Sequence, residues 1–156
     1  REDLYLLKEV LSFVENQYDF TIIDNSPSRN SLLNMSYIAA NYMIIPTECD
    51  TGSIDGIDAI YGDLKKYRKL KWTDAQVIGL ILTKMENTAM HTLALEQLGE
   101  KAKEMEEKPF VMSVRKGIKV SESKLAMQSL QHYDKYSNPA VDYRTITKRI
   151  LESVEG

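Results

Sequence analysis

Residues 18–56 read YDFTIIDNSPSRNSLLNMSYIAANYMIIPTECDTGSIDG, and the fold class follows from the pattern of this stretch. Two short apolar runs, 18–24 and 42–46, flank a segment with helical spacing that Asn30 or Ser31 can cap. Short, nearly uninterrupted apolar runs are typical of strands that are buried on both faces of a parallel sheet. The order strand, helix, strand therefore predicts a βαβ unit.

The same alternation continues on both sides of this unit. Apolar spacing predicts helices over about 4–17, 53–70, 90–106, 121–129 and 139–154, and further strands over 77–83 and 110–114. Strands that alternate with helices predict an α/β fold, a mostly parallel sheet with helices on both faces. Because no repeat or linker interrupts the pattern, we expect residues 1–156 to form a single domain.

Composition narrows the class of protein. Hydrophobic residues make up 43% and charged residues 28% of the 156 residues, which excludes a disordered or fibrous chain. One cysteine, Cys49, cannot form an internal disulfide, and we expect it to be structural because acidic residues flank it. This cysteine usage is typical of a reducing compartment, so we expect a cytoplasmic protein. No apolar run is long enough for a membrane span, and the first and last helices have no basic face, so we expect no membrane partner. The first residue is Arg1 rather than Met, which suggests that something was removed upstream.

Ligands of open α/β sheets bind where the strands end. The segments that follow the predicted strands are 24–30, 46–52, 83–88 and 115–119. Asp24 ends the first strand, and a carboxylate in that position can hold Mg²⁺ through its water shell. The alternative is an aspartate that only turns the chain.

Several of these segments, taken together and in order, resemble the ParA/Soj/MinD-type partition ATPases. Residues 18–56 match that family's apolar run, Asp, two residues, Pro, Ser, followed by a helix ending in Ala-Ala and a strand ending in Ile-Pro. Residues 119–123, KVSES, and 133–143, YDKYSNPAVDY, resemble two later family segments. The resemblance spans nearly the whole chain.

The resemblance implies a P-loop NTPase-like fold whose N-terminal phosphate-loop part is missing. No stretch here reads Gly-x-x-x-x-Gly-Lys-Ser/Thr, and the seven glycines do not cluster. We therefore expect the chain to be the C-terminal part of a larger ParA-like ATPase domain, inactive by itself.

The resemblance also implies site residues and partners. Asp24 would be the catalytic and Mg²⁺-side carboxylate, with Mg-ATP as the cofactor of the parent protein. Nucleotide contacts would come from Ser26, Pro27, Ser28, Thr83, Lys84, Arg115, Lys116 and Gly117. ATP would favour a homodimer that binds DNA non-specifically through Lys116, Lys119 and Lys124, and a ParB-like centromere-binding protein would stimulate hydrolysis. Such a protein would be cytoplasmic and associated with the nucleoid.

Two alternatives remain from the sequence. Ser26, Arg29 and Arg115 depart from the usual family residues, which would suit a degenerate, non-catalytic interaction module that has lost nucleotide binding. An unrelated doubly wound domain of the flavodoxin or response-regulator sort is the other, although the acidic pair expected after its first strand is missing.

Overall fold

The computed structural model describes residues 2–26 and 29–156, the side chains of Glu2 and Thr51 excepted. Pro27 and Ser28, two of the expected nucleotide contacts, lie outside the described residues. The chain divides into two compact units, one of residues 1–43 and 58–76 and the other of residues 44–57 and 77–156. The expectation of a single domain stays a prediction.

The second unit is built on a three-stranded sheet with the order β1-β2-β3. The strands are β1 (Tyr42–Thr47), β2 (Gln76–Met85) and β3 (Phe110–Arg115), so three of the four predicted strands are confirmed. β2 and β3 run parallel, and their register is irregular between Leu82 and Met85. The predicted α/β class with a parallel sheet is therefore confirmed.

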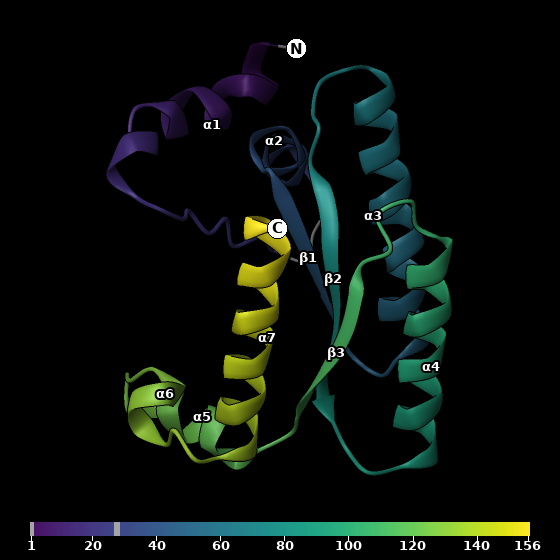
Figure 1. Ribbon diagram of the computed structural model, residues 1–156, viewed down its shortest axis with the longest axis vertical. Helices are drawn as coiled ribbons and strands as arrows, with labels where there is room; N and C mark the ends of the chain where they lie inside the picture. Colours follow the sequence, from purple (N-terminus) through teal and green to yellow (C-terminus); the bar gives the residue numbers. More distant parts are fainter. Residues whose placement is uncertain (1, 27–28) are drawn as a thin grey trace. The chain divides into compact units, whose positions relative to one another are not determined.

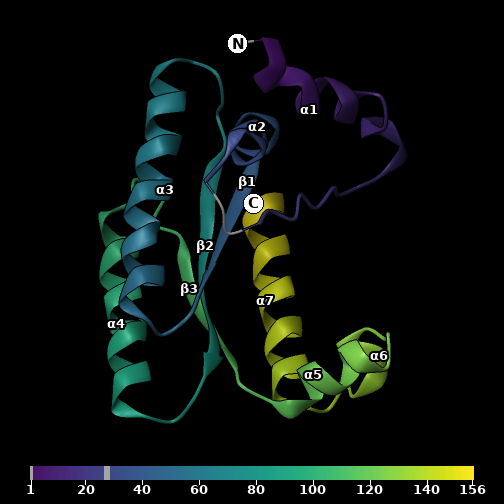
Figure 2. The ribbon, with the colours of Figure 1, turned by 180° about the vertical axis from the view of Figure 1, so that it is seen from behind.

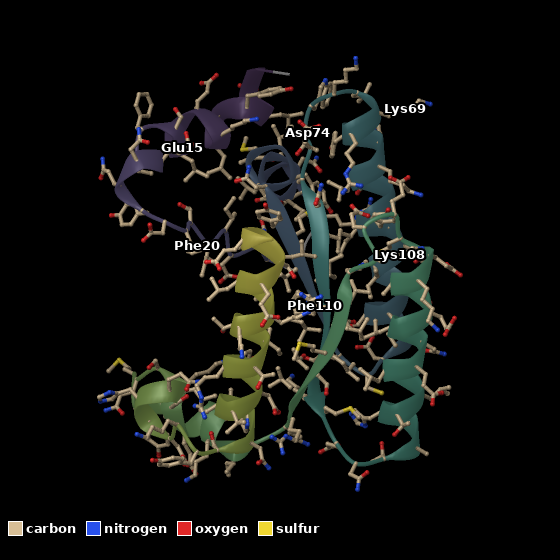
Figure 3. All side chains as sticks on the ribbon, in the orientation of Figure 1. Glu15, Phe20, Lys69, Asp74, Lys108 and Phe110 are labelled. Atoms are coloured by element: carbon tan, nitrogen blue, oxygen red, sulfur yellow. The ribbon has the colours of Figure 1, made fainter. Side chains whose placement is uncertain are left out.

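Helices α4 (Ala89–Glu104) and α7 (Asn138–Glu155) lie on opposite sides of β3 (Figures 1 and 2). On the α7 side, Ile146 packs with Ile81 and Val114 in a buried apolar cluster that Phe110, labelled in Figure 3, also joins. Burial of this apolar surface is what holds the helix on the sheet.

A close approach between β2 and β3 explains why residue 79 is a glycine. An added Cβ on Gly79 would lie 2.5 Å from the ring of Phe110, which pairs with Gly79 across β2 and β3. No side chain fits there without a shift of that ring. The glycine therefore lets the aromatic ring cover the sheet.

Helix α5 (Ile118–Leu125) begins three residues before the predicted start at residue 121 and ends four residues before the predicted end at residue 129. Gly117 takes the N-cap position directly after β3, and the helix starts there without a side-chain cap. Ser129 does not end this helix but caps the short helix α6 (Leu130–Tyr133), where it accepts from the backbone N–H of His132 at 3.2 Å.

Helix α3 (Thr51–Lys69) contributes residues through Ile57 to the second unit and the remainder to the first. In the first unit, α1 (Glu2–Ser12) packs against α2 (Ser31–Ala39), and a 3₁₀ turn, η1 (Glu15–Gln17), follows α1. The predicted cap of α2 is confirmed, since Asn30 Oδ1 accepts from the backbone N–H of Leu33 at 3.1 Å.

The predicted first strand, residues 18–24, is wrong. The segment is irregular, with a bend at Asp19, and belongs to no sheet; Ile22 is 91% exposed. Phe20, labelled in Figure 3, is also exposed on this segment. A strand persists only where a neighbour pairs with its backbone groups, and within the described residues 18–24 form no such pairing. The apolar content of residues 18–24 alone could not show that this pairing is missing among the described residues.

Among the helices of residues 2–26 and 29–156, none combines the length and the apolar character that a membrane span requires.

Candidate functional site

A pocket of about 210 Å³ lies in the second unit, where the three strands end. Its lining comes from the segment after β1, the end of β2, the start of α4 and the residue after β3. The lining residues are Glu48, Cys49, Asp50, Thr83, Lys84, Glu86, His91 and Lys116. The three predicted post-strand segments of this unit therefore meet in one place, as the rule for open α/β sheets predicts.

Two ion pairs cross this pocket. Lys84 Nζ lies 2.7 Å from a carboxylate oxygen of Glu48, and Lys116 Nζ lies 2.6 Å from a carboxylate oxygen of Glu86. The hydrogen bond from Lys116 holds the pKa of Glu86 below its ordinary value. Both pairs are partly exposed to water, so they fix side-chain positions more than they stabilise the fold.

The backbone at the end of β2 departs from regular strand geometry beside the pocket. Lys84 has a φ of 55°, in the left-handed region, next to the irregular register of β2 and β3. The Thr83 hydroxyl donates to the Thr47 carbonyl at 3.0 Å, and the Lys116 N–H donates to the Met85 carbonyl at 2.9 Å. These bonds tie all three strand ends together. A left-handed lysine at a pocket edge is the kind of strain that functional sites retain.

The remaining lining residues are also held in place. Asp50 accepts from the backbone N–H of Ser53 at 2.7 Å, and this bond lowers the pKa of Asp50. The His91 ring nitrogen Nδ1 and the Thr88 hydroxyl are 2.8 Å apart. Cys49 Sγ lies 3.6 Å from the Met90 carbonyl oxygen. The pocket is thus lined by side chains that already have partners.

The charge of the lining indicates what the pocket can take. Three carboxylates, of Glu48, Asp50 and Glu86, face two ammonium groups, of Lys84 and Lys116. The net charge of this lining is negative, which would repel a polyphosphate. It would not repel a neutral group that both donates and accepts hydrogen bonds. The donor set therefore fits the base or sugar of a nucleotide and does not fit its phosphates. Within the described part of the chain, no group of three His, Cys, Asp or Glu side chains is placed to hold a metal ion.

Three of the predicted nucleotide contacts, Thr83, Lys84 and Lys116, lie together in this pocket. Gly117 lies beside it as the N-cap of α5, and an added Cβ there would lie 3.0 Å from the Pro139 ring. That close packing gives Gly117 a structural role in addition to the predicted one.

Arg115 has a partner outside the pocket lining. Its Nη2 and Nε lie 2.8 and 2.9 Å from the two carboxylate oxygens of Asp142 on α7, and its backbone N–H donates to the same carboxylate at 2.9 Å. Burial pushes the pKa of Asp142 upward, but the bonds from Arg115 outweigh it and hold that pKa below its ordinary value. Arg115 thus fastens α7 to the end of β3, and its nucleotide contact stays a prediction.

Asp24 and Ser26 lie in the first unit, and both are exposed. Of the predicted DNA contacts, Lys119 Nζ donates to Glu122 at 2.7 Å, whereas Lys124 is an exposed residue in the last turn of α5. Tyr133 donates to the same Glu122 carboxylate at 3.1 Å. These roles stay predictions.

The sequence did not reveal Glu48, Glu86 and His91 as site residues. Each glutamate lies in a predicted post-strand segment, but its lysine partner is far away in sequence, 30 residues in the case of Glu86 and Lys116. The only available signal was an acidic residue directly after a predicted strand. No sequence motif surrounds His91.

Comparison with known proteins supports the resemblance. A family model described as "AAA domain" matches residues 1–77. The chain is 25% identical over 144 residues to the sporulation initiation inhibitor protein Soj of Bacillus subtilis, covering 92% of this chain and 56% of that protein. It is 26% identical over 149 residues to the chromosome-partitioning ATPase Soj of Treponema pallidum, covering 96% and 58%. The chain thus spans a little over half the length of these relatives.

Solved structures share the fold. The ATP complex of a Cyanothece McdA variant superposes with a TM-score of 0.79 at 17% identity, over 94% of this chain and 57% of that one. A putative plasmid partition protein from Borrelia burgdorferi, bound to AMPPNP, gives a TM-score of 0.76 at 20% identity, over 96% and 56%. The chain is therefore similar in sequence to these Soj proteins, and it shares its fold with these solved structures.

Proposed function

We propose that this chain works as part of an ATP-dependent partition protein and forms the base-side wall of its nucleotide site. The observation that carries the proposal is the pocket at the ends of β1, β2 and β3, which brings Thr83, Lys84 and Lys116 together. Its lining has a net negative charge and is rich in hydrogen-bonding groups, so it suits adenine or ribose better than phosphate. The similarity to a chromosome-partitioning ATPase, Soj of Treponema pallidum, supports the wider assignment.

The phosphate and metal contacts of the proposed site lie on other residues. Asp24 would hold Mg²⁺ through water, which needs few protein carboxylates because the nucleotide's phosphates supply further oxygens. Ser26, Pro27 and Ser28 would respond to the terminal phosphate. Mg-ATP bound in this way supplies the phosphoryl group and the charge neutralisation, while this chain binds and orients the nucleotide.

Association and DNA binding complete the proposal. ATP would favour a homodimer that binds DNA without sequence preference, and a ParB-like centromere-binding protein would stimulate hydrolysis in the cytoplasm, at the nucleoid. Lys116 and Lys119 are ion-paired with glutamates, so Lys124 is the proposed DNA contact with the least local neutralisation. Phosphate contacts of this kind depend strongly on salt.

The test is nucleotide discrimination. In the protein that carries this chain, the dissociation constants for ATP and GTP are measured by titration calorimetry for the wild type, Glu86→Ala and Lys116→Ala. Either substitution is expected to change the ratio of the GTP and ATP dissociation constants by about fivefold to tenfold towards equal affinity, because it alters one wall of the base pocket. Lys148→Ala, an exposed lysine on α7, is the matched control and should leave both constants unchanged.

Two outcomes would contradict the proposal. A wild-type protein that binds neither nucleotide favours the non-catalytic interaction module. Equal losses of ATP and GTP affinity in both variants, without any change in preference, place the base elsewhere.

A further inference from the structure

We propose that the neutral ring of His91 carries its proton on Nε2 and donates it to a ring nitrogen of adenine, so that His91 and the Glu86 carboxylate together select ATP over GTP. This inference rests on the proposed function, because it names the residues that distinguish the base in the same pocket. His91 would touch the base, whereas Thr88 would act through His91 as a positioning residue.

Thr88 holds the His91 ring. It is the N-cap of α4, and its hydroxyl oxygen accepts from the backbone N–H of His91 at 3.2 Å. The same oxygen lies 2.8 Å from His91 Nδ1. A hydroxyl has one proton and two lone pairs, and the backbone N–H already uses one lone pair, so the proton is available for Nδ1. The ring is thus fixed at Nδ1 by the residue three positions before it.

The surroundings of Nδ1 favour a lone pair there over a proton. The first turn of α4 presents backbone N–H groups that have no partner within the helix, and these give the helix N-terminus a partial positive charge. A lone pair on Nδ1 suits this setting, and the Thr88 hydroxyl then donates to it. The single ring proton of neutral His91 is therefore on Nε2.

Nε2 is the polar ring atom of His91 that remains for a ligand. His91 lines the pocket and is half-buried. Within residues 2–26 and 29–156, the hydrogen bond at Nδ1 is the only one that its ring makes. A donor at the wall of a pocket, without a protein partner, is a group that a ligand can satisfy.

Glu86 supplies the matching acceptor. Its Oε1 accepts from Lys116 Nζ at 2.6 Å, whereas its Oε2 has no partner in the described part of the chain. The bond from Lys116 lowers the pKa of Glu86, and His91 is near enough for a charge on its ring to act in the same direction. Glu86 is therefore an ionised group that only accepts, close to the His91 donor.

Adenine is complementary to this acceptor and donor. Its N6 amino group donates, and N7 on the same edge of the base accepts. Guanine presents the acceptor O6 where adenine has the amino group. In the arrangement that satisfies adenine, O6 of guanine would face a carboxylate oxygen, and neither atom would receive a proton. A site of this kind rejects the analogue that cannot make its hydrogen bonds.

The first measurement is the tautomer of His91 without nucleotide, from long-range proton–nitrogen NMR spectra at a pH where the nitrogen shifts show a neutral ring. The signals that disappear in His91→Phe belong to His91, and in the wild type they should show Nε2 protonated. Thr88→Asp should move the proton to Nδ1, because a carboxylate accepts but does not donate, while Asp still caps the helix. Thr88→Ser keeps the hydroxyl and should keep the wild-type tautomer.

The second measurement is base selection, by titration calorimetry with ATP and GTP in the protein that carries this chain. The wild type should bind ATP more tightly. His91→Phe keeps a flat ring without an N–H; it and Thr88→Asp should each move the ratio of the two dissociation constants by about fivefold to tenfold towards equal affinity. Two controls, Thr88→Ser and His132→Phe at an exposed histidine of α6, should leave the ratio unchanged.

The ratio separates base selection from a structural role. ATP and GTP share the ribose and the triphosphate, so a variant that only disturbs the fold weakens both alike. A wild-type protein that binds neither nucleotide refutes the proposed function, and this inference with it. Three results overturn the inference alone while ATP binding persists: neutral wild-type His91 protonated on Nδ1, a wild type without preference for ATP, or an unchanged ratio in both His91→Phe and Thr88→Asp.

Discussion

The hydroxyl of Tyr37 allows a sharp test of the packing of the first unit. Tyr37 lies on α2 with 0% of its surface exposed, and its ring centroid is 5.9 Å from that of Tyr67. Its hydroxyl has no hydrogen-bond partner among the described residues. Burial, reinforced by the nearby Asp63, raises the pKa of Tyr37 to about 12. The residue thus combines a well-packed ring with an unsatisfied polar atom.

Replacement of Tyr37 by Phe should stabilise the protein. A buried polar group without a partner costs about 1–3 kcal/mol. Removal of the hydroxyl recovers that cost, while the small void that it leaves returns part of it, at about 20 cal/mol for each Å² of cavity surface. The expected gain in the free energy of unfolding is therefore about 1 kcal/mol.

Urea unfolding measures this difference, provided that the slope with denaturant is the same in both proteins. Tyr133→Phe is the matched control, because the Tyr133 hydroxyl donates to Glu122 at 3.1 Å. That control should show no gain in stability. If Tyr37→Phe instead destabilises the protein by about 1 kcal/mol or more, the hydroxyl is hydrogen-bonded in solution and the reasoning is refuted.

Three further predictions concern the second unit. Gly79→Ala should lower the free energy of unfolding by about 1–3 kcal/mol through overpacking, and Phe110→Leu should recover part of that loss; two independent, additive losses would contradict the close contact. Bonds from Arg115 depress the pKa of Asp142 in the folded protein. The stability that they provide is therefore complete above about pH 4 and is lost as the pH falls through this lower pKa. The thermal midpoint of Asp142→Asn should fall less on acidification than that of the wild type, and an identical fall would refute this. Lys124→Ala should reduce the slope of log DNA affinity against log salt by about one, and an unchanged slope would exclude that contact.

Much of the second unit could be predicted from the sequence, since its strands are apolar runs. β2 is buried over most of its length, whereas β1 has exposed residues between its buried ones. Val77, Leu80 and Leu82 on β2 are fully buried, and this is what a continuous apolar pattern reports. The same pattern misled at 18–24. Periodicity describes one segment, whereas a strand also requires a neighbour, which no local pattern encodes.

The candidate site was predictable in place but not in detail. The rule that ligands bind at strand ends singled out the segments 83–88 and 115–119, and the family resemblance singled out Thr83, Lys84 and Lys116 within them. The pairing of each lysine with a glutamate depends on how three separate strand ends meet. Arg115 shows the same limit, because its partner Asp142 is 27 residues away on α7.

The most direct test of the nucleotide assignment is photoaffinity labelling of the protein with azido-ATP that carries the reactive group on adenine, followed by peptide mapping. The proposed base pocket predicts labelling of peptides containing Thr83 to Glu86 or Lys116, and loss of that labelling when excess ATP competes. Labelling confined to other peptides, or labelling that ATP does not displace, would contradict the assignment of this pocket to the base.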